Sequence, residues 1–416
     1  MRICSRADAV TENGGVYTIK TDAADIRLLF LTDDIIRIRA GFDGDWDEGS
    51  YSLVLTAWED RMDALLCGER KRVQPKMAEF TQTAEEFEFA GARLKVVVQK
   101  KPLCFMVYDK DGSLLHSDVP GTAFLEDQNK RRVHNSRINA DDRFYGFGER
   151  AGELDKARAF MTFDPSDSAG YDAKESDGLY KHIPFYIKLE KQSRIAVGYF
   201  YHNTAVCDFD MGRTHSNYFG RRSRYRAEQG DIDLFLIAGP SINEVIERYT
   251  DLTGKSAMLP AYALGYLGSS MYYSELEKDS DSAIVSFVDT NAENGIPIDG
   301  FQLSSGYTVV GGKRCVFNWN NDRFGNPAAF FYEMEKRGVT VSPNVKPGVL
   351  LVNPKAEDMK KRGVFVKKAE NDDAAVCRWW GGDGLLADFT SPAARAAWKE
   401  LLTENVLKNG HEQRLE

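Results

Sequence analysis

Apolar and polar positions divide the chain into two parts with different periodicity. Up to about residue 240, apolar residues recur in short, often alternating runs separated by turn residues. Ile26–Ile38 holds two such runs around Thr-Asp-Asp, and Phe105–Leu115 holds two around Asp-Lys-Asp-Gly, a hairpin turn. Many short strands with almost no helical period predict an N-terminal β-sandwich over residues 1–240.

The pattern changes to a helical period at Ser241–Leu252. Ser241 is suited to cap the helix, and Glu244 three residues later completes a capping box. We expect residues 241–258 to form a linker helix between two domains.

From Leu259 onward, apolar runs alternate with amphipathic helices. Ala263–Leu267 predicts a short strand, and Asp281–Asn291 has apolar residues at the i, i+3, i+4 spacing of a helix. Ile296–Leu303 predicts a second buried strand before a Ser-Ser-Gly-Tyr turn. Strand, helix and strand form a βαβ unit, which favours a parallel sheet with its chemistry at the carboxyl ends of the strands.

Three further elements continue this alternation. The pattern predicts a helix at Pro327–Arg337, a strand at Val339–Asn344 and a long helix at Ser391–Asn409. A complete (β/α)8 barrel needs about 250 residues. We therefore expect residues 259–416 to form the first part of an α/β TIM-type barrel, with three to four strands. Its uncovered apolar faces predict either a homo-oligomer or a missing C-terminal half.

Composition excludes several classes of protein. The chain of 416 residues has a net charge of −9, which disfavours a nucleic-acid partner. No apolar stretch approaches the length of a membrane span, and the first residues do not resemble a secretory signal. Six scattered cysteines without metal-ligand spacing are typical of a reduced compartment. We expect a cytoplasmic enzyme or binding protein without a metal or other cofactor.

A series of short motifs carries a family resemblance. In chain order they are Phe144–Glu149 (FYGFGE), Leu179–Phe185 (LYKHIPF), Leu259–Gly265 (LPAYALG), Trp319–Phe324 (WNNDRF) and Trp379–Pro392, with its WWGG and DFTSP ends. Each motif is weak alone, but their order and spacing together resemble glycoside hydrolase family 31, the α-glucosidases and related α-glycosyltransferases. The resemblance covers the chain from about Phe105 and implies a galactose-mutarotase-like sandwich before the barrel.

The resemblance also implies a mechanism. Retaining glycosidases use two carboxyl groups, one as nucleophile and one as general acid and base. In the family the nucleophile is an Asp in a W-x-D-x-N-E motif on the fourth barrel strand, and this motif does not occur here. We therefore expect both catalytic residues beyond Glu416 and none within the chain. The chain would then carry part of a sugar pocket and be inactive alone.

The end of the second barrel strand departs from the family pattern. Typical α-glucosidases have D-I-D-W there, and this chain has Ser304-Ser305-Gly306-Tyr307. Losing the first Asp puts simple α-glucosidase specificity in doubt and favours a sugar whose O6 or O4 is substituted or differently oriented. The sequence is similar to that of members that transfer or release isomaltosyl units. Taken in isolation, the same residues would be read as an ordinary βα turn.

Other positions correspond to sugar-contacting positions of the family. Met271 and Tyr272 lie at the end of the first strand, although Tyr272 could equally belong to the core. Lys346 stands where members often have Asp, and could equally be solvated. Trp379 and Trp380 are suited to stack on a sugar face. The resemblance further places Asp164 or Asp167, within the loop 162–177, near the leaving-group side of the barrel mouth.

The sequence thus predicts the N-terminal portion of a retaining α-glycosidase or α-glucosyltransferase acting on α-linked gluco-oligosaccharides, with isomaltosyl-type specificity. Hydrolysis and transfer differ only in whether water or a sugar hydroxyl meets the intermediate, so both stay open. The alternatives are an α-galactosidase-like specificity and a non-catalytic carbohydrate-binding remnant.

Overall fold

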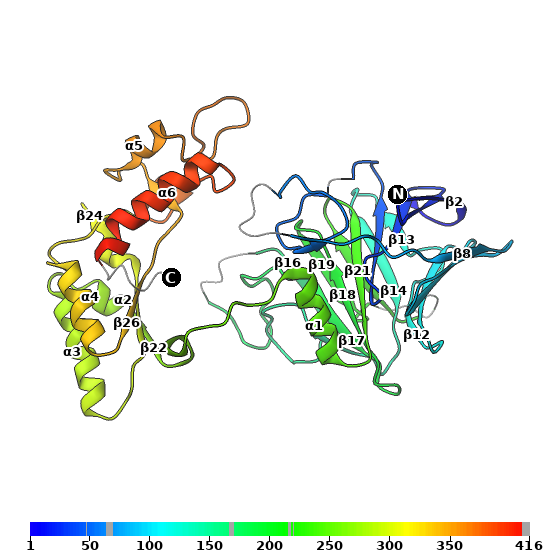
Figure 1. The fold of residues 1–416 in the computed structure, drawn as a ribbon, viewed down its shortest axis with the longest axis horizontal. Helices are drawn as coiled ribbons and strands as arrows, with labels where there is room; N and C mark the ends of the chain where they lie inside the picture. The colour runs from blue at the N-terminus through cyan, green and yellow to red at the C-terminus, as the bar shows by residue number, and fades with distance from the viewer. Residues whose placement is uncertain (47, 64–69, 166–169, 215–217, 219, 410–416) are drawn as a thin grey trace. The chain divides into compact units, whose positions relative to one another are not determined.

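The computed structural model describes residues 1–46, 48–63, 70–165, 170–214, 218 and 220–409 (Figure 1). The chain forms two compact units, Met1–Lys255 and Ser256–Glu416.

The first unit consists almost entirely of antiparallel strands. Its strands are β1 (Arg2–Ile3), β2 (Ala7–Asn13), β3 (Val16–Thr21), β4 (Asp25–Phe30), β5 (Ile35–Gly41), β6 (Leu55–Thr56), β7 (Lys71–Arg72), β8 (Glu79–Gln82), β9 (Glu86–Ala90), β10 (Leu94–Gln99), β11 (Cys104–Asp109), β12 (Leu114–Ser117), β13 (Phe124–Glu126), β14 (Arg132–Arg137), β15 (Arg143–Gly146), β16 (Phe160–Phe163), β17 (Phe185–Leu189), β18 (Ala196–Tyr201), β19 (Cys207–Met211), β20 (Arg222–Ala227) and β21 (Ile232–Gly239). They form an eight-stranded sheet in the order β15-β17-β18-β21-β5-β4-β3-β2, a six-stranded sheet β1-β13-β14-β20-β19-β16, a five-stranded sheet β12-β11-β10-β9-β8 and a parallel pair β6-β7.

Both faces of the central strands β18, β21 and β5 of the eight-stranded sheet are buried, whereas the edge strand β2 is mostly exposed. Tyr199 and Tyr201 of β18 enter the main core, which they share with residues of the other two large sheets. Phe200 between them points to the opposite face and joins a second core. This alternation follows from the two-residue period of a strand. The predicted N-terminal β-sandwich is therefore confirmed.

Helix α1 (Ile242–Thr253) covers the second core. Ser241 and Glu244 form the predicted capping box at its start. Val245 is fully buried against the sheet, and Tyr249 stacks on Phe185 with ring centroids 3.7 Å apart. These contacts make the predicted linker helix a packed element of the first unit, whose boundary follows Lys255.

The second unit begins with a parallel sheet of strands β22 (Leu267–Ser270), β23 (Gly300–Leu303) and β26 (Thr340–Pro343). The 3₁₀ turn η1 (Ala261–Leu264) precedes β22. Between the strands lie, in chain order, α2 (Met271–Ser274), α3 (Ser280–Glu293), η2 (Ser305–Thr308), β24 (Val309–Val310), β25 (Lys313–Arg314) and α4 (Pro327–Lys336). Helices α3 and α4 pack on the sheet through a small apolar core. This is the strand and helix alternation of a TIM-type barrel.

Two strand boundaries differ from those expected. The predicted strand at Ala263–Leu267 is wrong, because residues 261–264 form a 3₁₀ turn and the strand starts at Leu267. The small residues Gly268, Ser269 and Ser270 belong to the strand because they pair in parallel with β23, where a Cβ atom on Gly268 would lie 3.1 Å from the ring of Phe301. The second strand begins only at Gly300, since Ile296 is exposed.

The rest of the unit forms a second small core. Its elements are β27 (Gly348–Leu350), α5 (Ala356–Lys361), β28 (Val376–Trp379), β29 (Gly382–Leu386), α6 (Pro392–Asn405) and η3 (Leu407–Asn409). The expected long helix is shorter than predicted: α6 ends at Asn405, and a 3₁₀ turn follows. No helix in the described part of the chain is both long and apolar enough to cross a membrane.

Candidate functional site

A cavity of about 270 Å³ opens in the second unit. Residues that directly follow β22, β23 and β26 contribute Met271, Ser304 and Asn344 to its wall. The complete lining is Met271, Glu275, Ser304, Ser305, Thr308, Arg314, Val316, Asn344, Lys346, Gly348, Trp379 and Trp380. The cavity thus lies at the carboxyl ends of the parallel strands, where barrel folds place their active sites.

The structure brings six of the predicted sugar-contacting residues together. They are Met271, Ser304, Ser305, Lys346, Trp379 and Trp380. Because they come from separate segments of the chain, only the fold could unite them. This grouping makes the cavity the candidate site.

Tyr307 and Tyr272 lie elsewhere. Tyr307 is buried in the core, where its hydroxyl donates to the carbonyl of Asn344 at 3.1 Å and its ring packs against Trp319. It supports the end of β26 instead of lining the cavity. Tyr272 is 70% exposed, contacts Tyr273 edge-on at 5.2 Å and is not part of the lining.

Trp379 is fixed by close packing against backbone. A Cβ atom on Gly348 would lie 2.2 Å from Cε2 of Trp379, so this glycine lets the indole ring lie directly on the chain. Trp380 beside it is 57% exposed and presents an accessible aromatic surface. One tryptophan is therefore held rigidly at the wall of the cavity, and the other is available to a ligand.

Two charged residues in the wall were missed by the sequence analysis. Nη2 of Arg314, on β25, donates to Oε1 of Glu275 at 2.5 Å. The pair joins positions far apart in the sequence, so no local pattern reveals it. The one local signal at this position is the Gly-Gly-Lys-Arg run that ends at Arg314. It resembles a phosphate-binding loop only superficially and does not indicate the pair with Glu275.

Lys346 also faces the cavity. It is half-buried, and among the residues described by the structure its ammonium group has no hydrogen-bond or ion-pair partner. With Glu275 and Arg314 it gives the cavity a mixed, mainly positive lining. Such a lining suits a ligand with many hydroxyl groups, which both donate and accept hydrogen bonds.

The predicted acidic loop belongs to the first unit. Asp164 directly follows β16 and is exposed, whereas Asp167 lies outside the described residues. The loop is anchored by Asp177, which accepts from the backbone N–H of Thr162 at 2.7 Å and pairs with Arg150 at 3.0 Å. Its approach to the barrel mouth stays a prediction.

The sequence analysis also did not identify a histidine cluster in the first unit, formed by His116, Asp118 and His134. Nε2 of His116 and Nε2 of His134 lie 2.8 and 2.9 Å from Oδ1 of Asp118, at a spacing that could hold a metal ion. Their Nδ1 atoms contact the hydroxyls of Tyr199 and Tyr201 at 3.1 and 2.8 Å. Every ring nitrogen thus has a hydrogen-bond partner, and the cluster is complete as a buried network.

Ser50, His202 and Asp233 are arranged like a hydrolytic triad. Oγ of Ser50 lies 2.7 Å from Nε2 of His202, whose Nδ1 lies 3.1 Å from Oδ2 of Asp233. However, Ser50 is only 2% exposed, and its hydroxyl accepts from the backbone N–H groups of Ser52 and Leu53. A buried hydroxyl occupied in this way cannot attack a substrate.

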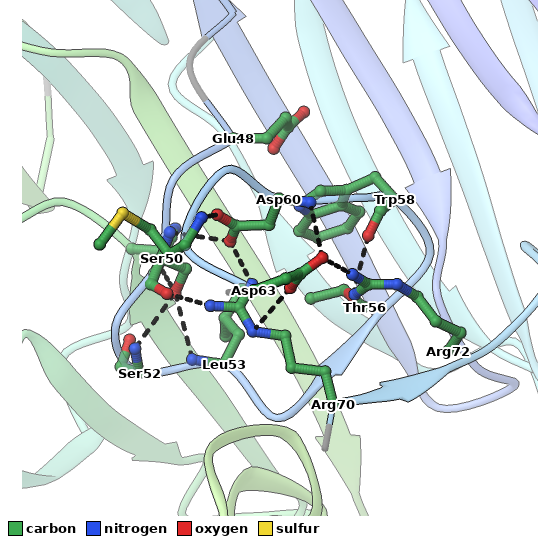
Figure 2. Close-up of polar contacts among 12 residues, drawn as sticks. Glu48, Ser50, Ser52, Leu53, Thr56, Trp58, Asp60, Asp63, Arg70 and Arg72 are labelled. Carbon is green, nitrogen blue, oxygen red and sulfur yellow. Dashed lines mark hydrogen bonds and ion pairs between the residues drawn. The ribbon is translucent and has the colours of Figure 1, made fainter. Parts of the chain in front are cut away.

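The neighbours of Ser50 show what this arrangement does (Figure 2). The buried carboxylate of Asp60 accepts from the backbone N–H of Ser50 at 2.8 Å and pairs with Arg70. Arg70 also donates to the carbonyl of Ser50, and Arg72 pairs with Asp63. These contacts join the two described parts of the connection between β5 and β8 to each other, and the contact of Ser50 with His202 joins it to the sheet through Asp233 of β21.

Comparison with known sequences accounts for most of the chain. Residues 25–210 match the glycosyl hydrolase 31 N-terminal galactose mutarotase-like domain, and residues 256–413 match the glycosyl hydrolases family 31 TIM-barrel domain. The chain belongs to glycoside hydrolase family 31. The predicted sandwich and incomplete barrel of this family are thereby confirmed.

Individual relatives support the same assignment. Alpha-glucosidase 2 of Bacillus thermoamyloliquefaciens is 30% identical over 389 residues, which cover 92% of this chain and 45% of that protein. A family 31 dextranase of Flavobacterium johnsoniae, solved with isomaltotriose, matches 99% of this chain and 47% of its own with a TM-score of 0.83 and 22% identity. The cycloalternan-forming enzyme of Listeria monocytogenes, solved with a pentasaccharide substrate, matches 97% of this chain and 38% of its own with a TM-score of 0.72 and 19% identity. The matched part of the chain spans less than half the length of these curated relatives, 45% and 44% for two α-glucosidases.

Proposed function

We propose that this chain is the N-terminal portion of a retaining α-glycosidase or α-glucosyltransferase that acts on α-linked gluco-oligosaccharides. Its contribution is to bind the sugar in the cavity of the second unit. The nucleophile and the general acid/base are supplied by residues beyond Glu416.

The composition of the cavity carries this proposal. The wall combines two tryptophans with serine hydroxyls, an amide and three charged side chains, a mixture suited to the faces and hydroxyls of a sugar. Glu275 is the one carboxylate among the described lining residues, and it is paired with Arg314. A retaining mechanism needs two carboxyl groups about 5–5.5 Å apart. The cavity is therefore suited to hold a sugar and lacks the pair that breaks the bond.

We further propose isomaltosyl-type specificity. Ser304 and Ser305 line the cavity where the family pattern has an aspartate. Two structural relatives are a dextranase solved with isomaltotriose and a cycloalternan-forming enzyme solved with a pentasaccharide. Both support a substrate with a glucosyl unit extended by further sugars, in preference to a single terminal glucose.

An activity assay tests the proposal. The complete enzyme expressed from its gene is compared with residues 1–416 alone on nitrophenyl α-glucoside, nitrophenyl α-galactoside, isomaltotriose and panose. We expect the complete enzyme to turn over the isomaltosyl substrates fastest and residues 1–416 to be inactive. Turnover by residues 1–416 would show that a catalytic pair lies within this chain.

The other outcomes select between the alternatives. Preference for the galactoside would replace the specificity assignment, and sugar binding without turnover by the complete protein would make it a carbohydrate-binding protein. Product analysis then separates hydrolysis from transfer, because transfer yields longer oligosaccharides.

We also propose a reduced, cytoplasmic setting. The cysteines within the described residues, Cys4, Cys104, Cys207, Cys315 and Cys377, are all free, and the first four are buried. Detection of these thiols in the purified native protein by a thiol-reactive dye after unfolding checks this expectation.

A further inference from the structure

We infer that Glu275 replaces the aspartate that the family pattern has at the second strand, and that it accepts hydrogen bonds from sugar hydroxyls in the cavity. Arg314 is a positioning residue that holds its carboxylate. The inference rests on the proposed function and deepens it, because it names a specificity-determining group supplied by the segment that follows a different strand, β22.

The backbone around Glu275 ties it to the end of β23. Oγ of Ser274 accepts from the backbone N–H of Ser304 at 3.3 Å and donates to the carbonyl of Ser270 at 3.1 Å. These bonds join the segment after β22 directly to the segment after β23. Glu275 therefore emerges beside Ser304, the position at which the carboxylate is lost.

Gly306 makes room for this side chain. A Cβ atom at position 306 would lie 2.3 Å from Cγ of Glu275 and 2.7 Å from the carbonyl oxygen of Ser274. Both distances are far below van der Waals contact, so any other residue would displace Glu275. The Ser-Ser-Gly-Tyr sequence thus removes a carboxylate from one strand and admits another from its neighbour.

The ionic contact leaves the carboxylate available to a ligand. Arg314 contacts only Oε1 of Glu275, and among the described residues Oε2 has no hydrogen-bond partner. The side chains are 37% and 29% exposed, and ion pairs as accessible as this contribute little to stability. A carboxylate oxygen without a hydrogen-bond partner at a cavity wall is well suited to receive O–H donors.

The test pairs enzyme variants with substrate analogues. Wild type, E275Q, R314M and R314K of the complete enzyme are assayed on nitrophenyl α-glucosides that each lack one hydroxyl. E400Q is the matched control, because Glu400 forms an ion pair with Arg362 at 2.7 Å in the same unit and does not line the cavity. Thermal melts of all variants report folding.

We expect E275Q to lower kcat/KM roughly 10- to 100-fold on the intact glucoside, the loss typical of a charged hydrogen bond. On the analogue that lacks the recognised hydroxyl, E275Q and wild type should be equally active. R314M should raise KM with a smaller effect on kcat, R314K should recover part of the loss, and E400Q should leave both unchanged. An equal loss on every analogue, or no loss, would overturn the inference.

A second set of variants tests whether Glu275 takes the place of the aspartate. S304D places a second carboxylate in the cavity and should lower activity through repulsion, whereas S304D/E275Q should recover it with unsubstituted terminal glucose. Independent losses in the two variants would contradict replacement. If the wild-type enzyme turns over no glycoside, titration with isomaltotriose decides: equal binding by wild type and E275Q overturns the inference alone, and absent binding overturns the proposed function as well.

Discussion

The two units differ in how completely they bury apolar residues. In the first, both faces of the central strands of the eight-stranded sheet are covered, and aromatic rings from three sheets pack together. In the second, the three-stranded parallel sheet supports one small core, and the antiparallel sheet β27-β29-β28 supports another. Large apolar side chains such as Met258, Leu264 and Val352 are exposed there, at 96%, 75% and 66%.

Stability and the candidate binding chemistry therefore lie in different parts of the chain. The first unit arranges triad-like and metal-like groups, but buries them and satisfies their hydrogen bonds. The second leaves a charged pair, a lysine and a tryptophan around an open cavity. Partly exposed, incompletely paired polar groups are costly to a core and useful to a binding site.

The largest expected effect is on separating the units after Lys255. Residues 1–255 should be monomeric and melt cooperatively, because their sheets bury each other. Residues 256–416 should self-associate and lack a sharp transition, because the parallel sheet and apolar faces are uncovered. Light scattering and circular dichroism measure both. A monomeric, cooperatively melting second fragment would remove the contrast between the units.

A smaller effect is expected from opening a cavity in the first unit. Phe209 is almost fully buried and packs edge-on against Phe147 and Phe163, with centroids 5.3 and 5.0 Å away. F209A should lower the free energy of unfolding of residues 1–255 by about 3–5 kcal/mol. F80A, at a partly exposed ring, is the control and should cost less than about 1.5 kcal/mol. Urea denaturation gives both values, and similar losses would indicate a loosely packed core.

The smallest effect expected is a pH dependence confined to the first unit. Burial lowers the pKa of His116 below its usual 6.5 despite the nearby Asp118, with His134 and Lys188 adding to the decrease. Because the unfolded chain binds this proton more readily, stability is full above pH 6.5 and decreases below it, on the order of 1 kcal/mol per pH unit. Burial raises the pKa of Asp118, but the charges and hydrogen bonds of His116 and His134 outweigh it and hold this pKa at about 2, so the contribution of Asp118 is lost only in stronger acid.

Chemical denaturation of residues 1–255 between pH 7 and 5 measures this slope, and H116Q should flatten it. H182Q is the control at a less buried histidine. Burial lowers the pKa of His182 as well, so we expect H182Q to change the pH slope too, but less than H116Q does. A slope unchanged in H116Q would assign the acid sensitivity to other groups.

Much of the fold was predictable because it depends on local patterns. The hairpin around Asp109–Gly112, the helix capped by Ser241 and the helix at Asp281–Asn291 all form where turn residues, caps and periodicity indicate. The strand near Ala263 was misplaced because Gly268, Ser269 and Ser270 look like a loop. They form a strand through parallel pairing with β23, in which Gly268 lies opposite Phe301, and this long-range pairing is not encoded in periodicity.

The candidate site was predictable only in part, for a related reason. Family motifs pointed to Ser304, Lys346 and Trp379 individually. The pair of Glu275 and Arg314 depends on a contact across 39 residues, and the burial of Tyr307 depends on its packing against Trp319. Such contacts form between residues that only the folded structure brings together, so a single sequence does not reveal them.

The arrangement of Ser50, His202 and Asp233 has a consequence for recognising enzymes by shape. A search with the three-residue template of a serine hydrolase would accept it, since both contacts lie within 3.1 Å. The arrangement is not a hydrolase site because the hydroxyl of Ser50 already accepts hydrogen bonds and is shielded from solvent. A template of three residues records neither property. The same three-residue geometry can serve to hold a loop in place. A geometric match should therefore be judged together with the solvent accessibility of the nucleophile and the hydrogen bonds that it already makes.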